Sequence, residues 1–291
     1  MDKEFTTKPL LFLLLISLII TGAATACRRE QRPAQQKKKE SIPVSLSSIV
    51  DNSQAVIEQM ERLQQEMEKP AGQQGGETGG GEGEDQQGGQ GKGGGQGEGQ
   101  GSGQSPPNPE QEKKQKIDKI WEETLKIVED THRQWNDYES TAIKDKARDY
   151  TMTEFERFLN GLTVAVNRQD IYATMEQANG MCLAAAHFLD LYKNNPDGQI
   201  TKVRYYLQQS CIDAGQDDWA GARQSVTAGK REAEELEREV ELEEADRGLI
   251  EKLNLSIDNM EAAMANRDLD LLKIKKDIAL ENLDKVKEKA K

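Results

Sequence analysis

Histidine and cysteine are scarce in this chain, and proline is scarce beyond residue 110. Each scarcity excludes a class of site or structure. The 291 residues include two histidines and three cysteines, too few for a clustered zinc site or a disulfide-rich scaffold. Only Pro196 lies beyond residue 110, so almost nothing there interrupts a helix. The formal net charge of −13 repels phosphate backbones. We therefore expect no metal, no cofactor and no nucleic-acid partner.

The C-terminal part, residues 110–291, predicts an all-α domain. It holds all three tryptophans, and its 38 acidic residues outnumber its 28 lysines and arginines. Apolar residues recur three and four positions apart, which favours a helical bundle or a short α-hairpin solenoid. Trp121 and Trp135 fall on one such stripe and are expected in its core. The expected helices are 112–148, one opened by a capping box of Thr153 and Glu156, 171–193, 199–214, 218–246, 249–265 and a last one ending near residue 287.

Three of the expected turns resemble one another, at 166–170, 214–218 and 264–268. In each, an asparagine or glycine is expected to take a left-handed conformation at the end of a helix. An aspartate then caps the next helix. The spacing of about 47 to 51 residues indicates either a repeated pair of helices or three ordinary turns that use the same residue types.

Residues 41–69 predict one further helix, which Asp51 or Ser53 could cap. A single helix of this length is marginal alone, so it needs a partner. Residues 70–109 consist mostly of glycine, glutamine and glutamate, and 17 of the 25 glycines lie there. Such a composition cannot offset its ordering entropy and predicts a disordered linker.

The N-terminus carries the only recognisable targeting signal. An apolar run, residues 10–20, is followed by Ala24-Thr25-Ala26-Cys27. This pattern resembles the lipobox of bacterial lipoproteins, and the resemblance covers residues 1–27. It implies a signal peptide over 1–26, a diacylated Cys27 at the mature N-terminus and a basic tether over 27–40, with the body at the extracytoplasmic face of the cell membrane.

The charges flanking the apolar run favour a different topology. Two acids and two lysines precede the run, whereas six basic residues follow it, at Arg28, Arg29, Arg32 and Lys37–Lys39. The positive-inside tendency would keep that side in the cytoplasm on an uncleaved anchor. An apolar run of this length is short for a membrane span, so the lipoprotein interpretation is preferred.

Few residues suggest chemistry. Cys182 and Cys211 flank Pro196 almost symmetrically, so a disulfide is possible if both face each other, although neighbouring reduced thiols are favoured. Glu129 and His132 form one Glu-x-x-His motif, but a di-iron site needs a second such motif. We find no catalytic constellation and expect no enzyme.

The sequence therefore favours a lipid-anchored extracytoplasmic binding or scaffold protein, held in the membrane through Cys27 and facing a protein or cell-envelope partner. One alternative is a solute- or metal-binding receptor in which Glu129, His132, Trp135 and Trp219 would converge on a pocket. The other is a membrane-anchored cytoplasmic adaptor, if the N-terminal segment stays uncleaved.

Overall fold

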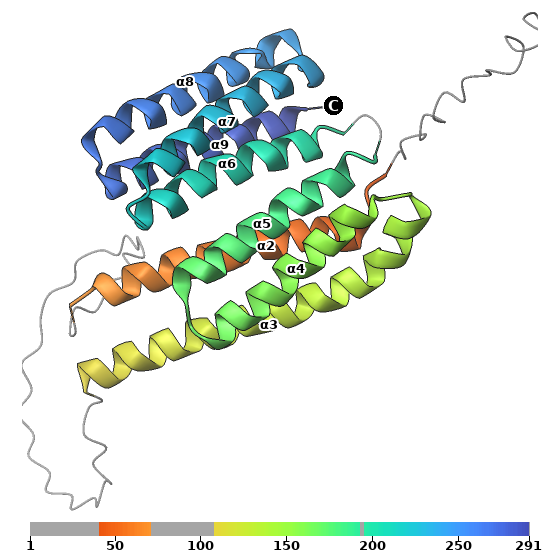
Figure 1. The fold of residues 1–291 in the computed structure, drawn as a ribbon. Helices are drawn as coiled ribbons and strands as arrows, with labels where there is room; N and C mark the ends of the chain where they lie inside the picture. The colour runs from red at the N-terminus through yellow and green to blue at the C-terminus, as the bar shows by residue number, and fades with distance from the viewer. Residues whose placement is uncertain (1–40, 71–107, 193–194, 291) are drawn as a thin grey trace, which may run out of the picture. The chain divides into compact units, whose positions relative to one another are not determined.

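The computed structural model describes residues 41–70, 108–192 and 195–290, and the regular elements of these ranges are helices (Figure 1). The all-α prediction is therefore confirmed. The longer helices are α2 (Val44–Glu68), α3 (Pro109–Lys144), α4 (Asp149–Asn167), α5 (Ile171–Leu189), α6 (Asp197–Gly215), α7 (Trp219–Glu239), α8 (Gly248–Ala263) and α9 (Leu269–Lys289). A short 3-10 turn, η1 (Glu244–Asp246), precedes α8, and a second one, η2 (Met264–Asn266), follows it.

The helices form two bundles in succession, each with its own hydrophobic core. In the first bundle α2 packs against α3 and α5, and α4 packs against the same two helices. In the second bundle α6 packs against α7 and α9, and α8 packs against the same two helices (Figure 1). Neighbouring helices within each bundle run antiparallel, as short connections require.

Aromatic residues concentrate in the first core. Trp135 lies 4.3 Å from Phe155 and 5.6 Å from Phe188, measured between ring centroids, and Tyr138 lies 5.5 Å from Phe188. Such separations suit tilted and edge-on ring contacts. Trp121 is also buried, so both predicted core tryptophans are confirmed. The second core is built mainly from leucine, isoleucine, valine, methionine and alanine.

The three similar turns share one geometry, and they connect α4 to α5, α6 to α7 and α8 to α9. The predicted caps are confirmed, because the carboxylates of Asp170, Asp218 and Asp268 accept backbone N–H groups at 2.9 to 3.0 Å. The predicted left-handed residues are wrong. Helical or 3-10 backbone continues through the asparagine or glycine, so the reversal falls on the residue directly before each aspartate. These residues are Gln169 (φ 54°), Asp217 (φ 64°) and Arg267 (φ 48°).

Two predicted helix starts are also wrong. Helix α4 begins at Asp149, one turn before Thr153, so Thr153 and Glu156 form no capping box. Helix α2 begins after Pro43, so neither Asp51 nor Ser53 caps it. Ser53 instead lies in the buried interior of α2, where its hydroxyl donates to the Ile49 carbonyl at 2.8 Å.

Three helices end earlier than predicted. Helix α3 stops at Lys144, and Lys146 turns the chain with φ 61°. Helix α5 stops at Leu189 and α7 at Glu239. Val240 is extended and packs, together with Leu242, against the second core. Burial of these two apolar side chains therefore overrides the helical tendency of the acidic stretch that continues to Asp246.

Helix α2 is part of the first bundle rather than a separate element. Leu46, Ile49, Val56 and Ile57 are buried in the same core as Trp135. Lys113 of α3 donates through Nζ to the carbonyl oxygens of Met67 and Lys69 at the end of α2, both at 2.7 Å. The predicted linker lies largely outside the described residues, but its two ends meet. It therefore connects neighbouring helices of one bundle, and α2 has the partners that its length requires.

This arrangement predicts that the Gly/Gln-rich segment can be shortened without loss of the fold. Closing a loop of about 37 residues costs more entropy than closing one of about 8, by about 1.4 kcal/mol. Replacing residues 71–107 with a short Gly/Ser loop is expected to raise the free energy of unfolding by about that amount. Urea denaturation measures it. A linker between independent bodies would leave the stability unchanged when shortened.

Candidate functional site

The residues predicted to form a receptor pocket do not converge. Trp135 is buried among the aromatics of the first core, whereas Trp219 packs against the second core. The His132 ring contacts the Thr163 hydroxyl at 2.9 Å, between α3 and α4. Glu129 is exposed. Over residues 41–70, 108–192 and 195–290, no three His, Cys, Asp or Glu side chains gather as a metal site requires.

Cys182 and Cys211 are both free and buried. The two cysteines were expected at the same level, on helices folded back about Pro196. The point about which α5 and α6 fold back lies instead about three residues earlier in the chain. Asn179 shows this register, since its amide donates to the Tyr205 carbonyl at 3.1 Å and to the Gln209 side chain at 2.9 Å. Cys211 consequently lies about seven residues, or about 10 Å, beyond the level of Cys182. A disulfide requires a much closer approach, so the possible bond is not formed.

The most unusual group that the structure describes is a buried lysine between the two bundles. Lys276 of α9 is only 3% exposed. Its ammonium contacts Glu61 of α2 at 2.5 Å and Asp277 at 3.1 Å. Burial alone would lower the pKa of Lys276, but Glu61 and its other neighbours outweigh that effect and hold the pKa above its ordinary value. The lysine therefore stays charged and ties α9 to α2.

One further polar contact supports the same junction. Lys273, one turn before Lys276, donates to the Gln64 side chain of α2 at 3.2 Å. Within the second bundle, the nearly buried Arg204 of α6 pairs with Asp284 of α9. These groups were not predicted. The available signal was the position of Lys276 in the buried stripe of α9, which also includes Leu272, Ala279 and Leu283.

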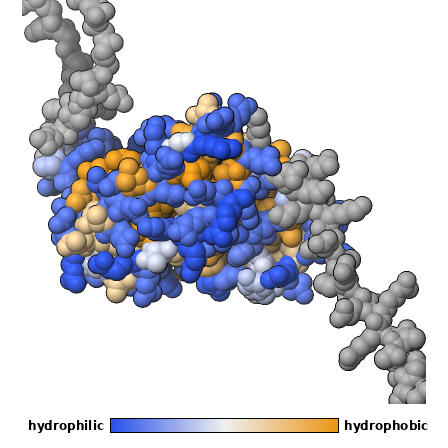
Figure 2. All heavy atoms as spheres, turned by 90° about the horizontal axis from the view of Figure 1, so that it is seen from above, coloured by the Kyte–Doolittle hydropathy of each residue, from blue (hydrophilic) through white to orange (hydrophobic). Residues whose placement is uncertain are grey.

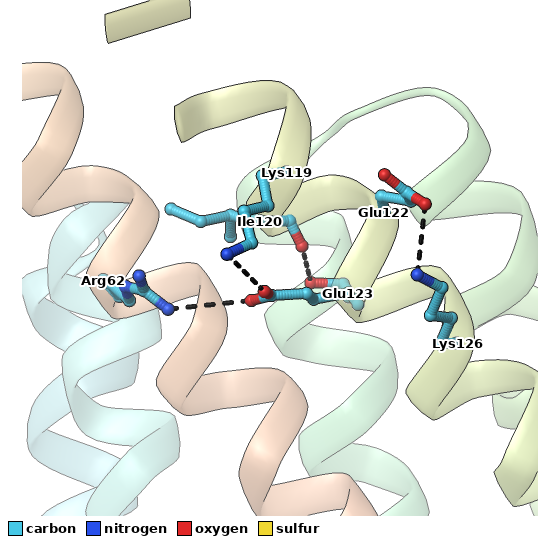
Figure 3. A network of polar contacts seen from close by, with 7 residues as sticks. Arg62, Lys119, Ile120, Glu122, Glu123 and Lys126 are labelled. Carbon is cyan, nitrogen blue, oxygen red and sulfur yellow. Dashed lines mark hydrogen bonds and ion pairs between the residues drawn. The ribbon is translucent and has the colours of Figure 1, made fainter. Parts of the chain in front are cut away.

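Ion pairs on the outer surface between α2 and α3 are of a different kind. Figure 3 shows Arg62 reaching Glu123 at 3.7 Å, with Lys119 on the same carboxylate at 3.6 Å. Beside them, Lys126 pairs with Glu122 at 3.1 Å. Exposed pairs of this sort are screened by water and salt and contribute little. They solubilise the helical face and form no site.

A groove of about 620 Å³ lies where α7 passes into α8. Its lining combines acidic and apolar side chains with one arginine: Glu237, Val240, Glu241, Leu242, Arg247, Ile250 and Glu251. The groove is open to solvent, and its walls come from the extended segment after α7 and the first turn of α8. It lacks the enclosed apolar interior that is typical of small-molecule sites.

Helices α8 and α9 expose three large aliphatic side chains. Leu255, Ile274 and Ile278 point into solvent. The Asn282 amide donates to the Lys252 carbonyl at 3.5 Å, which places Leu255 level with Ile278 on the neighbouring helix. The molecular face seen in Figure 2 is hydrophilic over most of its area, with hydrophobic residues gathered in patches between hydrophilic ones. A group of exposed aliphatic side chains on one face is a candidate contact surface.

No protein-family model, curated protein or solved structure matches the chain. None of the helices in the described ranges has the length and apolar character needed to cross a membrane. The apolar run 10–20 and Cys27 lie outside those ranges.

Proposed function

We propose that this protein is a lipid-anchored scaffold or binding protein of the extracytoplasmic membrane face. A single observation carries the proposal: Cys27 directly follows Ala24-Thr25-Ala26 and a short apolar run. Small residues before a cysteine suit cleavage by a signal peptidase, and the apolar run has the length of a signal core rather than of a membrane span.

The helical body supports a role in binding. Two bundles in succession present long helical faces, and the exposed aliphatic residues of α8 and α9 make one of those faces suitable for a protein partner. The buried Lys276–Glu61 pair joins α9 to α2, so the two bundles would be presented to a partner as one unit.

A second candidate, a membrane-anchored cytoplasmic adaptor, is favoured by the charges around the apolar run. The basic residues lie on its C-terminal side, which matches an uncleaved anchor with the body in the cytoplasm. The two candidates differ in whether residues 1–26 remain on the protein.

Replacing Cys27 with serine separates them. The wild-type protein is expected to lose residues 1–26 and to carry lipid, whereas Cys27→Ser retains the N-terminal segment and migrates as a larger, unacylated species. Cys182→Ser is the matched control, because Cys182 is buried in α5, and it is expected to be processed like the wild type. Identical sizes for wild type and Cys27→Ser would contradict the lipoprotein proposal and favour the adaptor.

A further inference from the structure

The end of the first bundle where the chain enters α2 exposes large apolar side chains. Val44, in the first turn of α2, is 81% exposed. Ile143, near the end of α3, is 60% exposed, and Tyr150, at the start of α4, is 55% exposed. Single exposed apolar side chains are common, but a group of large ones at one end of a bundle is informative.

The register of α2 against α3 places these residues at one end. Asn52 of α2 donates to the side chains of Asp130 and Thr131, both at 3.2 Å. Counting along the antiparallel pair from this contact, Ile143 lies only about 7 Å beyond the level of Val44 along the helix axis. Ile42 and Ala147 pack on the same core, and Figure 1 shows the α3–α4 turn and the start of α2 at the same end.

Three cationic residues and two aspartates lie in and beside the α3–α4 turn. Lys144, Lys146 and Arg148 are all exposed. The nearby Asp145 carboxylate accepts the Tyr192 hydroxyl at 3.0 Å. Asp149 is the first residue of α4, where the helix dipole favours a negative charge. Residues 143–150 therefore carry three cations and two carboxylates, a net charge of +1.

We define the stem-proximal surface by the six residues Val44, Ile143, Lys144, Lys146, Arg148 and Tyr150. We propose that this surface rests on an anionic lipid bilayer, an inference that depends on the proposed anchor at Cys27. Aliphatic and tyrosine side chains among lysines and arginines match the boundary between acyl chains and anionic head groups.

The length of chain before α2 identifies the bilayer as the occupant. Even fully extended, the chain from Cys27 to Ser41 reaches only about 50 Å. A lipid on Cys27 would therefore hold this end of the bundle within reach of the head groups at all times. Lys37–Lys39 add further cations directly before Ser41.

Contact is confined to the first bundle. The segment that follows α7 in the second bundle carries Glu241, Glu243, Glu244 and Asp246, and an anionic surface repels it. We therefore expect the bilayer to meet the α3–α4 turn and not the α7–α8 connection.

The test uses the processed, acylated protein in vesicles, with a fluorescent label at Ile143→Cys. Cys182 and Cys211 are buried and Cys27 would be acylated, so the introduced thiol is the reactive one. We expect a head-group quencher to reduce the label's fluorescence in vesicles that contain phosphatidylglycerol, and to do so far less in phosphatidylcholine alone. Val164→Cys is the matched control, because Val164 is 47% exposed at the other end of α4, and its label should stay unquenched.

Charge removal completes the design. Lys144→Gln with Arg148→Gln is expected to abolish the lipid-dependent quenching at position 143, while the protein remains on the vesicles through its lipid. Equal fluorescence at position 143 in both lipids, with the protein still anchored, would overturn the stem-proximal surface and leave the anchor intact. A protein that lacks acyl chains would overturn the anchor, and this inference with it.

Discussion

Replacing Glu61 with leucine is expected to lower the free energy of unfolding by about 3 kcal/mol. The substitution leaves the ammonium of Lys276, which is 3% exposed, without its closest partner. Asp277 remains 3.1 Å away, but its side chain is 67% exposed and compensates little. Urea denaturation at neutral pH measures the loss.

The control is to remove both charges. Lys276→Met alone removes the buried ammonium and leaves a carboxylate that water already reaches, so its cost is smaller than that of Glu61→Leu. The double variant is expected to be close to the wild type in stability, because two apolar groups replace a buried ion pair. If the two single effects simply add in the double variant, Lys276 and Glu61 are not energetically coupled.

The same pair makes stability depend on alkaline pH. Because the folded-state pKa of Lys276 lies above its ordinary value of 10.5, its stabilising contribution is fully present below pH 10.5. That contribution is lost as the pH rises through the raised value. The wild type should therefore lose more stability in this range than Lys276→Met does.

Replacing Ile57 with alanine is expected to cost about 3 kcal/mol, because Ile57 of α2 is fully enclosed by the first core. Trp121 and Trp135 lie in that same core, so their fluorescence during urea unfolding reports the change. The midpoint of their transition should shift to lower urea concentration.

Leu255→Ala provides the comparison, since Leu255 is exposed on α8 and its truncation should change stability by no more than about 0.5 kcal/mol. If α2 were an independent helix on a linker, Ile57→Ala would leave the tryptophan transition where it is in the wild type.

Local patterns predicted much of the fold. The apolar stripes located the helices α2 to α9, and the aspartate caps of α5, α7 and α9 followed from residue type and spacing alone. Helix ends were less predictable because long-range burial decides them. Val240 leaves the helix to pack on the second core, a contact that the acidic sequence around it does not indicate.

The contacts of α2 could not be predicted from the sequence. The Gly/Gln-rich segment separates α2 from α3 in the chain, and Lys113 shows that the ends of this segment meet only because the helices pack together. The Lys276–Glu61 pair depends on that packing as well. In the same way, the levels of Cys182 and Cys211 depend on where the α5–α6 turn is centred, which Pro196 alone did not reveal.

Intact mass spectrometry of the membrane-extracted protein tests the proposed anchor most directly. A chain that begins at residue 27 and carries the added mass of a diacylglyceryl group is the predicted result. A full-length, unmodified chain that still begins at Met1 would contradict it.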